Sequence, residues 1–195
     1  MRYRINEIFN SIQGEGAHAG RNATFVRFSG CNLNCSFCDT SHQQGTWMET
    51  TQILEQCKKY ATRFVVLTGG EPTIWDLTPL LGELHKNGFY VAMETNGTRS
   101  VPSAVDWVTC SPKAGLCAGA NIGINGADEV KVLYTGEAFD DKAYVGIKAK
   151  EYYLQPLDTY REEENRRIID SLLGYIQTHP QWRLSVQLHK LLGVQ

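Results

Sequence analysis

The sequence predicts an α/β protein built as a reduced, partial (β/α) barrel, with about six parallel strands and about three full helices. Three observations support this fold class. Short apolar segments with β-branched and aromatic residues recur along the chain, helical periodicity lies between several of them, and polar or glycine-rich turns follow most of them. The chain has 195 residues and no obvious linker or internal repeat, so residues 1–195 are expected to form a single domain.

Six segments are expected to form the strands, because each is short and apolar and most of them end at Gly, Pro, Ser or Asn. They span residues 23–30, 63–70, 89–97, 105–113, 128–134 and 151–156. Strands that alternate with helices build a parallel sheet, so the loops that follow these strands should meet at one edge of it and form the active site there.

Three helices are expected between and after the strands. One apolar face is formed by Ile53, Leu54, Cys57, Tyr60 and Ala61, a second by Leu77, Leu80, Leu81 and Leu84 after a cap at Asp76, and a third by Ile168, Ile169, Leu172, Leu173 and Ile176. The spacing of Thr159 and Glu162 predicts a capping box at the start of the third helix. Residues 114–128 are too rich in glycine for a stable helix and are expected to form a loop.

Charge and composition exclude several classes of partner. The net charge is −2 and the basic residues are scattered, so no nucleic-acid-binding surface is predicted. No apolar run approaches the ~20 residues that span a bilayer, and the amino terminus lacks the apolar centre of a signal peptide, so we expect a cytoplasmic protein without a membrane partner. In that reducing compartment the six cysteines are not expected to form a disulfide framework.

Three cysteines lie within eight residues, in the segment GCNLNCSFCDT at residues 30–40. They are Cys31, Cys35 and Cys38, and such a group in a reducing compartment indicates metal or redox chemistry. A structural zinc ion needs four ligands, and His42 could complete such a site. A 4Fe-4S cluster held by three thiolates leaves one iron open for an outside ligand, which would explain why there are three cysteines rather than four.

The pattern Cys-x3-Cys-x-aromatic-Cys, with Phe37 as the aromatic residue, resembles the signature of the radical S-adenosylmethionine (SAM) enzymes. The GGEP segment at residues 69–72 resembles their second motif. Over nearly the whole chain the sequence is similar to one family of these enzymes, the 7-carboxy-7-deazaguanine synthases of queuosine and deazapurine biosynthesis. The similarity lies in FNSIQGEG, TGGEP, ETNG, SPK and QP, and in RLSVQLHKLLG at residues 183–193.

This resemblance implies a radical SAM core with three cofactors, namely a 4Fe-4S cluster on the three cysteines, SAM, and Mg²⁺ on Thr40. The residues that it implies for SAM are Phe37, Cys38, Asp39, Gly69, Gly70, Glu71, Glu94, Asn96, Ser111, Pro112, Lys113, Gln155 and Pro156. The polar members of this set suit the amine, ribose and carboxylate of SAM. Residues 30–40 would form the loop around the cluster.

The resemblance also implies a small-molecule pterin substrate, 6-carboxy-5,6,7,8-tetrahydropterin, which the family converts to 7-carboxy-7-deazaguanine with loss of ammonia. The candidates for substrate binding are Ile12, Gln13, Gly14, Glu15, Arg27, Thr68 and His189. A carboxylate and an amide suit the amidine edge of a pterin, for which Glu15 and Gln13 are candidates, and Arg27 suits its carboxylate. His189 and Lys190 either line the pocket or cap the last strand.

The family further implies an external electron donor such as a flavodoxin, and a homodimer. Two other functions stay open on the sequence. One is a small activase that makes a glycyl radical in a partner protein and shares the cysteine spacing and GGEP. The other is a non-enzymatic iron-sulfur or zinc module, which would not need glycine-rich turns at several strand ends.

Overall fold

The computed structural model describes residues 1–38, 40–136, 139–144 and 146–194. The strands in these ranges are β1 (Arg2–Ile12), β2 (Asn22–Phe28), β3 (Thr46–Glu49), β4 (Phe64–Gly69), β5 (Tyr90–Thr95), β6 (Trp107–Cys110), β7 (Glu129–Tyr134), β8 (Glu151–Pro156) and β9 (Arg183–Leu184). The helices are α1 (Thr50–Lys58), α2 (Thr78–Lys86), α3 (Glu162–Thr178) and α4 (Leu188–Leu192), with short 3-10 helices η1 (Gly16–His18), η2 (Pro72–Ile74) and η3 (Asp141–Ala143).

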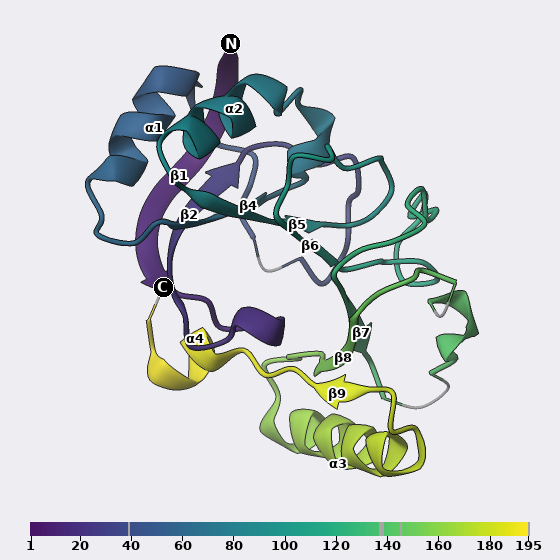
Figure 1. The fold of residues 1–195 in the computed structure, drawn as a ribbon. Coiled ribbons are helices and arrows are strands. Elements are labelled where there is room, and N and C mark those ends of the chain that lie inside the picture. The colour runs from purple at the N-terminus through teal and green to yellow at the C-terminus, as the bar shows by residue number, and fades with distance from the viewer. Residues whose placement is uncertain (39, 137–138, 145, 195) are drawn as a thin grey trace.

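All of these strands belong to one sheet with the order β3-β1-β2-β4-β5-β6-β7-β8-β9. Every neighbouring pair from β2 to β9 is parallel, whereas β1 is antiparallel to both β2 and β3. The sheet curves into an open barrel, with α1 and α2 outside one half and α3 outside the other (Figure 1). The predicted fold class, a partial barrel with a parallel sheet, is therefore confirmed.

The six predicted strands correspond to β2, β4, β5, β6, β7 and β8. β8 has the predicted bounds, β2 begins one residue earlier and ends two residues earlier, and the other four are shorter than predicted. The strands β1, β3 and β9 were not predicted. β1 lacks a regular apolar alternation because a register shift between Ile5 and Glu7 interrupts it, and β9 has only two residues. The loop expected at residues 114–128 is confirmed, since its only regular feature is an isolated bridge from Gly126 to Lys148.

The three predicted long helices are present, but two predicted caps were wrong. The N-cap of α2 is Leu77, while Asp76 accepts a hydrogen bond from the Thr78 amide at 3.1 Å. Before α3, the Thr159 hydroxyl and amide both donate to Asn165 Oδ1 at 2.8 Å, so Thr159 forms no capping box with Glu162.

The apolar face of α3 is narrower than predicted. Ile168 and Leu172 are buried against the sheet, but Ile169 and Leu173 remain 36% and 42% exposed. The two exposed side chains lie one residue after the buried ones, about 100° further around the helix, and so point away from the sheet. One turn of the helix therefore contributes only one fully buried side chain.

Two apolar cores lie on the outer side of the sheet. The first packs α1 and α2 against β1, β2, β4 and β5, and the second packs α3 against β7 and β8. The inner side of the barrel instead receives η1 and the carboxyl-terminal α4, which lie close together (Figure 1). Within the described residues, no helix has both the length and the apolar character that a membrane crossing requires.

Candidate active site

A cavity of about 960 Å³ opens on the inner side of the barrel. The ends of the parallel strands contribute to its wall, as expected from the meeting of such ends at one edge of a sheet. The sequence-predicted residues that line it are Ile12, Gln13, Gly14, Glu15, Arg27, Cys31, Cys35, Phe37, Cys38, Thr40, Thr68, Gly69, Gly70, Glu94, Asn96, Ser111, Lys113, Gln155, Pro156 and His189. Glu71 and Pro112 do not line this cavity, and Asp39 lies outside the described residues.

The three clustered cysteines follow β2 and reach the cavity together. Cys31 and Cys35 are half-buried and Cys38 is exposed. The loop turns tightly, because the Cys38 amide donates to the Cys35 carbonyl at 3.2 Å, and the Leu33 amide points at Cys31 Sγ at 3.4 Å. An amide directed at a cysteine sulfur is the kind of contact that stabilises a thiolate bound to iron.

Two glycines at the end of β4 allow the chain to approach this loop. A Cβ atom at Gly70 would collide with the Gly30 carbonyl and contact Cys31, and Gly69 has a φ of +126°, which favours glycine. The Glu71 amide then donates to the Gly30 carbonyl at 2.9 Å. The GGEP turn is thus packed directly against the start of the cysteine loop.

The surroundings of Cys31 and Cys35 disfavour their thiolate forms in the metal-free chain. Burial raises the pKa of Cys31, and burial together with a hydrogen bond to the Cys117 thiol raises the pKa of Cys35 to about 12. Cys117 belongs to the loop at residues 114–128, and the sequence analysis had treated it as isolated. Binding of iron would therefore displace protons from these thiols.

The donor set fits a 4Fe-4S cluster. Three thiols from one loop line a single cavity beside a glycine turn, and an amide faces one of the sulfurs. In the described part of the chain, no three His, Cys, Asp or Glu side chains converge closely enough to hold a single metal ion.

Glu71 is fully buried and acts within the protein framework. Its carboxylate accepts hydrogen bonds from the backbone amide of Thr73 at 3.0 Å, the hydroxyl of Thr95 at 2.8 Å and the backbone amide of Asn96 at 2.7 Å. These contacts tie the turn after β4 to the end of β5. The structure thus places Glu71 behind the cavity wall, where it positions Asn96, and its predicted contact with SAM stays a prediction.

Polar groups at the ends of β5 and β6 do line the cavity. The side-chain Nδ2 of Asn96 donates to Asn32 Oδ1 at 3.0 Å, which links the turn after β5 to the cysteine loop. Lys113 Nζ donates to the carbonyl and the hydroxyl of Ser111 at 2.6 and 2.5 Å. Burial lowers the pKa of Lys113. The two contacts with Ser111 hold the Lys113 side chain in the wall of the cavity.

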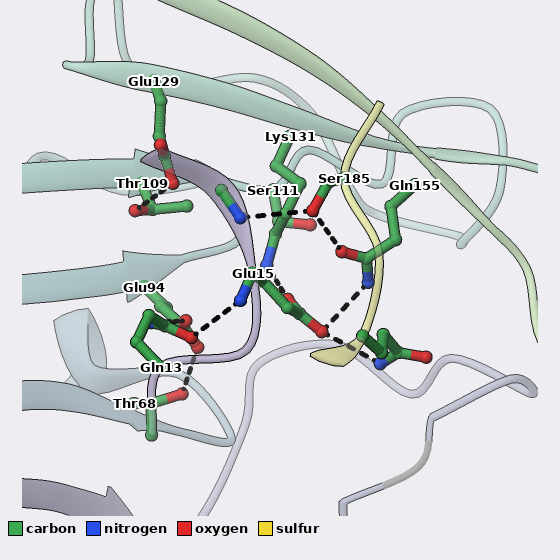
Figure 2. Close-up of polar contacts among 12 residues, drawn as sticks. Gln13, Glu15, Thr68, Glu94, Thr109, Ser111, Glu129, Lys131, Gln155 and Ser185 are labelled. Carbon is green, nitrogen blue, oxygen red and sulfur yellow. Dashed lines mark hydrogen bonds and ion pairs between the residues drawn. The ribbon is translucent and has the colours of Figure 1, made fainter. Parts of the chain in front are cut away.

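Residues 13–16, which we name the floor loop, follow β1 and close the inner end of the cavity. Gln13 Nε2 donates to Glu94 Oε1 at 3.0 Å, and the Thr68 hydroxyl donates to Glu94 Oε2 at 2.8 Å. Glu15 forms an ion pair with Lys131 and accepts a hydrogen bond from Gln155 Nε2 at 3.1 Å (Figure 2). The floor loop is therefore bonded to strands on both sides of the barrel.

Lys131 is the main site residue that the sequence analysis missed. It is 6% exposed, and Glu15 and Glu94 hold its pKa above the usual range despite its burial. Burial alone would raise the pKa of Glu15, but the Lys131 ammonium and further hydrogen bonds lower it from 4.5 to about 2. A signal was available, because a lysine in the middle of the apolar strand DEVKVLY must have a buried partner.

The carboxyl-terminal segment covers the floor loop. The Leu188 amide donates to the Gly14 carbonyl at 3.0 Å, and Gln187 Nε2 donates to Glu15 Oε1 at 2.9 Å. A Cβ atom at Gly14 would collide with the His189 imidazole, so glycine is needed at this position for the two segments to pack. His189 thus lines the pocket and does not cap the last strand.

Arg27 and Thr40 meet on the wall between β2 and the cysteine loop. Arg27 Nε donates to Glu7 Oε1 at 2.7 Å, and Arg27 Nη1 donates to Thr40 Oγ1 at 3.5 Å. Arg27 is a half-buried cation that lines the same cavity as the thiols, and its predicted anionic partner would enter from the cavity. The arrangement can therefore hold a flat polar ligand between a carboxylate-rich floor and a cationic wall.

Comparison with known proteins gives consistent matches. A family model described as the radical SAM superfamily matches residues 25–160. A protein from Bacteroides thetaiotaomicron named 7-carboxy-7-deazaguanine synthase is 47% identical over 195 residues, with 100% of both chains covered. A protein of the same name from Neisseria meningitidis is 40% identical over 204 residues, with 100% of this chain and 95% of that protein covered.

Solved structures agree with these matches. The crystal structure of QueE from Escherichia coli superposes with a TM-score of 0.72 at 31% identity, covering 97% of this chain and 95% of that chain. Streptococcus suis SuiB superposes with a TM-score of 0.51 at 14% identity, covering 81% of this chain and 47% of that chain, and supports the fold alone.

Proposed function

This chain belongs to the radical SAM superfamily and, within it, to the 7-carboxy-7-deazaguanine synthases, and we propose that it converts 6-carboxy-5,6,7,8-tetrahydropterin to 7-carboxy-7-deazaguanine with loss of ammonia. The single observation that carries this proposal is the cavity. It brings three clustered cysteines, a glycine turn, a carboxylate-rich floor and an arginine together in one space. The full-length relatives bear the synthase name, so the alternatives of a glycyl-radical activase and a non-enzymatic module are not favoured.

Cys31, Cys35 and Cys38 would hold the 4Fe-4S cluster, and SAM would lie against the turns after β4, β5, β6 and β8. When bound, the cluster and SAM supply a 5'-deoxyadenosyl radical that abstracts hydrogen from the substrate. The chain contributes a cavity in which Gly69 and Gly70 let the turn after β4 pack closely against residues 28–31, and Leu33 and Phe37 add apolar side chains to the lining.

Glu15 of the floor loop and Glu94, which is bonded to Gln13, are the carboxylates that could bind the amidine edge of the pterin. Glu15 already accepts from Lys131, Gln155 and Gln187, whereas Glu94 accepts from Gln13 and Thr68 and still has acceptor capacity on both oxygens. Glu94 is therefore the better placed of the two carboxylates to accept further hydrogen bonds from a ligand. Glu15 would then act chiefly by fixing the floor loop.

The wall would bind the negative end of the substrate. Arg27 would pair with the pterin carboxylate, and Thr40 would be one oxygen ligand of a Mg²⁺ ion that also contacts the substrate. Mg²⁺ prefers about six oxygen ligands and keeps several waters, so one protein hydroxyl is sufficient. The contact of Arg27 Nη1 with Thr40 Oγ1 at 3.5 Å supports a shared site for these two roles.

The proposal includes an external electron donor such as a flavodoxin, a homodimer and a cytoplasmic location. Exposed apolar side chains near the carboxyl terminus support a contact between two copies. They are Leu184, Val186, Leu191, Leu192 and Val194, which are 41%, 39%, 74%, 54% and 44% exposed. Burying such a patch against a second copy would remove apolar surface from water.

The test is anaerobic reconstitution of the iron-sulfur cluster, followed by incubation with SAM, a reductant and the carboxypterin. We expect 7-carboxy-7-deazaguanine in the mass spectrum and ammonia in equal amount. The same reaction with reconstituted Cys35→Ala protein is the control. Cleavage of SAM by the wild-type protein without any deazaguanine product would overturn the proposed substrate.

A further inference from the structure

The first strand contains a β-bulge beside the cavity. In the pairing of β1 with β2, Ile5 is opposite Phe28 but Glu7 is opposite Arg27, so one extra residue, Asn6, lies in β1. Ile5 belongs to the core under α1 and α2. Side chains alternate along a regular strand, so Glu7, two residues after Ile5, would share the face of Ile5 if the strand had no bulge. The bulge moves Glu7 to the opposite face, which lines the cavity.

On that face Glu7 meets Arg27 directly. The two residues are cross-strand partners, and Arg27 Nε donates to Glu7 Oε1 at 2.7 Å. The guanidinium also lies 5.7 Å from the centre of the Phe9 ring. One edge of the guanidinium is therefore occupied by a carboxylate from the neighbouring strand, and its Nη1 atom points toward Thr40.

We propose that Glu7 is a positioning residue for the substrate carboxylate, because it holds the Nε edge of Arg27 and leaves the terminal Nη atoms directed into the cavity. This inference rests on the proposed function, in which Arg27 binds the carboxylated pterin. An arginine side chain has several rotamers, and a partner that selects one of them removes part of the entropy that substrate binding would otherwise lose. Glu7 acts through Arg27 and has no role in the chemical step.

The same bulge also fastens the segment that follows the clustered cysteines. Asn6 Nδ2 donates to the carbonyls of Ser41 and Gln44, each at 3.0 Å. Two consecutive residues of β1 thus hold the segment after the cysteines and the arginine. These contacts of Asn6 and Glu7 fix Arg27 relative to the segment after the cysteines. A substrate bound to Arg27 would therefore also be held at a defined position relative to the thiols.

Charge and orientation act in opposite directions at Glu7. Its negative charge repels the substrate carboxylate, whereas its hydrogen bond orients the arginine that attracts it. Glu7→Gln and Glu7→Ala both remove the charge, but only glutamine keeps an acceptor for Arg27 Nε. The difference between these two variants therefore isolates the orienting effect.

The experiment measures binding of the carboxypterin to cluster-loaded protein with SAM, and KM and kcat in the same samples. We expect Glu7→Ala to bind the substrate ~10-fold more weakly than Glu7→Gln, with KM changed and kcat nearly unchanged. Glu7→Asn, which is also neutral but whose shorter side chain withdraws the acceptor from Arg27 Nε, is expected between the two. Uncoupled cleavage of SAM without substrate should be the same in all three variants.

Glu83→Ala is the matched control, because it removes another glutamate whose ion pair, with Lys86 at 2.8 Å, lies on the outer helix α2. Equal substrate affinity of Glu7→Ala and Glu7→Gln would overturn the inference. If Glu7→Ala does not fold, equal affinity of Glu7→Asn and Glu7→Gln would overturn it instead. Failure of the wild-type protein to bind the carboxypterin would contradict the proposed function, so the two failures are distinguishable.

Discussion

The cysteine loop and the floor loop line the same cavity, but they are held very differently. In the cysteine loop, Cys38 is exposed, and burial raises the pKa of the Cys31 and Cys35 thiols. In the floor loop, Glu15 is paired with a buried lysine and bonded to two glutamines (Figure 2). The floor is thus organised by the chain itself, whereas the cysteine loop is completed only by the group that it binds.

This difference implies that changes in the two loops should have different consequences. A change in the cysteine loop should remove chemistry and leave the fold intact, because few contacts of the folded chain depend on the thiols. A change in the floor loop should lower stability first, because it leaves a buried charge without a partner.

Replacing Cys31, Cys35 or Cys38 by alanine should abolish SAM cleavage, because each supplies one of the three thiolates. We expect the melting temperature of the metal-free protein to change little. Cys57→Ala, which alters a buried cysteine of α1, should retain the cluster, and Cys110→Ala and Cys117→Ala should retain it as well. Iron analysis and the visible spectrum provide the measurement, and detection of a fourth thiolate ligand would contradict the open-iron site.

Lys131→Met should destabilise the protein by ~3–5 kcal/mol, because removing one partner of a buried ion pair leaves the other charge uncompensated. Unfolding in urea of the metal-free protein measures this effect. The double variant Lys131→Met with Glu15→Gln should recover part of the loss, since it removes the orphaned charge. Equal stability of wild type and Lys131→Met would show that the floor is not organised by this pair.

Arg27→Ala should weaken binding of the carboxypterin by ~2–5 kcal/mol, because a charge-assisted contact is lost while the ligand carboxylate stays buried. Uncoupled cleavage of SAM should survive. Substrate titration and a SAM-cleavage assay on the same preparation separate the two activities. Parallel loss of both would assign Arg27 to the fold or to the cofactor.

The contribution of the floor loop to stability should decrease at acidic pH. The pKa of Glu15 is lowered from 4.5 in the unfolded reference to about 2 in the folded chain. Its stabilising contribution is therefore complete above about pH 4.5 and is lost as the pH falls toward about 2, and it amounts to roughly 3 kcal/mol. Urea unfolding between these pH values should show this loss in the wild type and a smaller one in Glu15→Gln.

Thr40→Val should have the smallest effect. We expect Mg²⁺ to stimulate turnover of the wild type several-fold, and the valine variant to lose most of that stimulation with unchanged iron content and visible spectrum. If the wild type kept its full rate in excess chelator, or Thr40→Val kept the full response to Mg²⁺, Thr40 would not be a ligand of Mg²⁺. Its role would then be limited to the structure of the turn.

Local sequence was sufficient for the six strands β2, β4, β5, β6, β7 and β8, for the long helices and for the cysteine motif. A strand such as β4 is recognised from a few consecutive apolar residues, and the spacing of Cys31, Cys35 and Cys38 lies within one loop. The C-terminal ends of parallel strands meet at one edge, so the sequence also predicted that their polar turns, including those at Asn96 and Ser111, would share a cavity.

Tertiary structure alone decided which polar residues serve the framework. Glu71 resembles a ligand-binding residue in the sequence, but the fold buries it among Thr73, Thr95 and Asn96. Lys131 and Glu15 are 116 residues apart, and no local pattern indicates that they pair. The role of a polar side chain depends on whether its hydrogen-bond partners are water molecules or groups of a distant segment. Only the packing of the whole chain determines which of these partners it has.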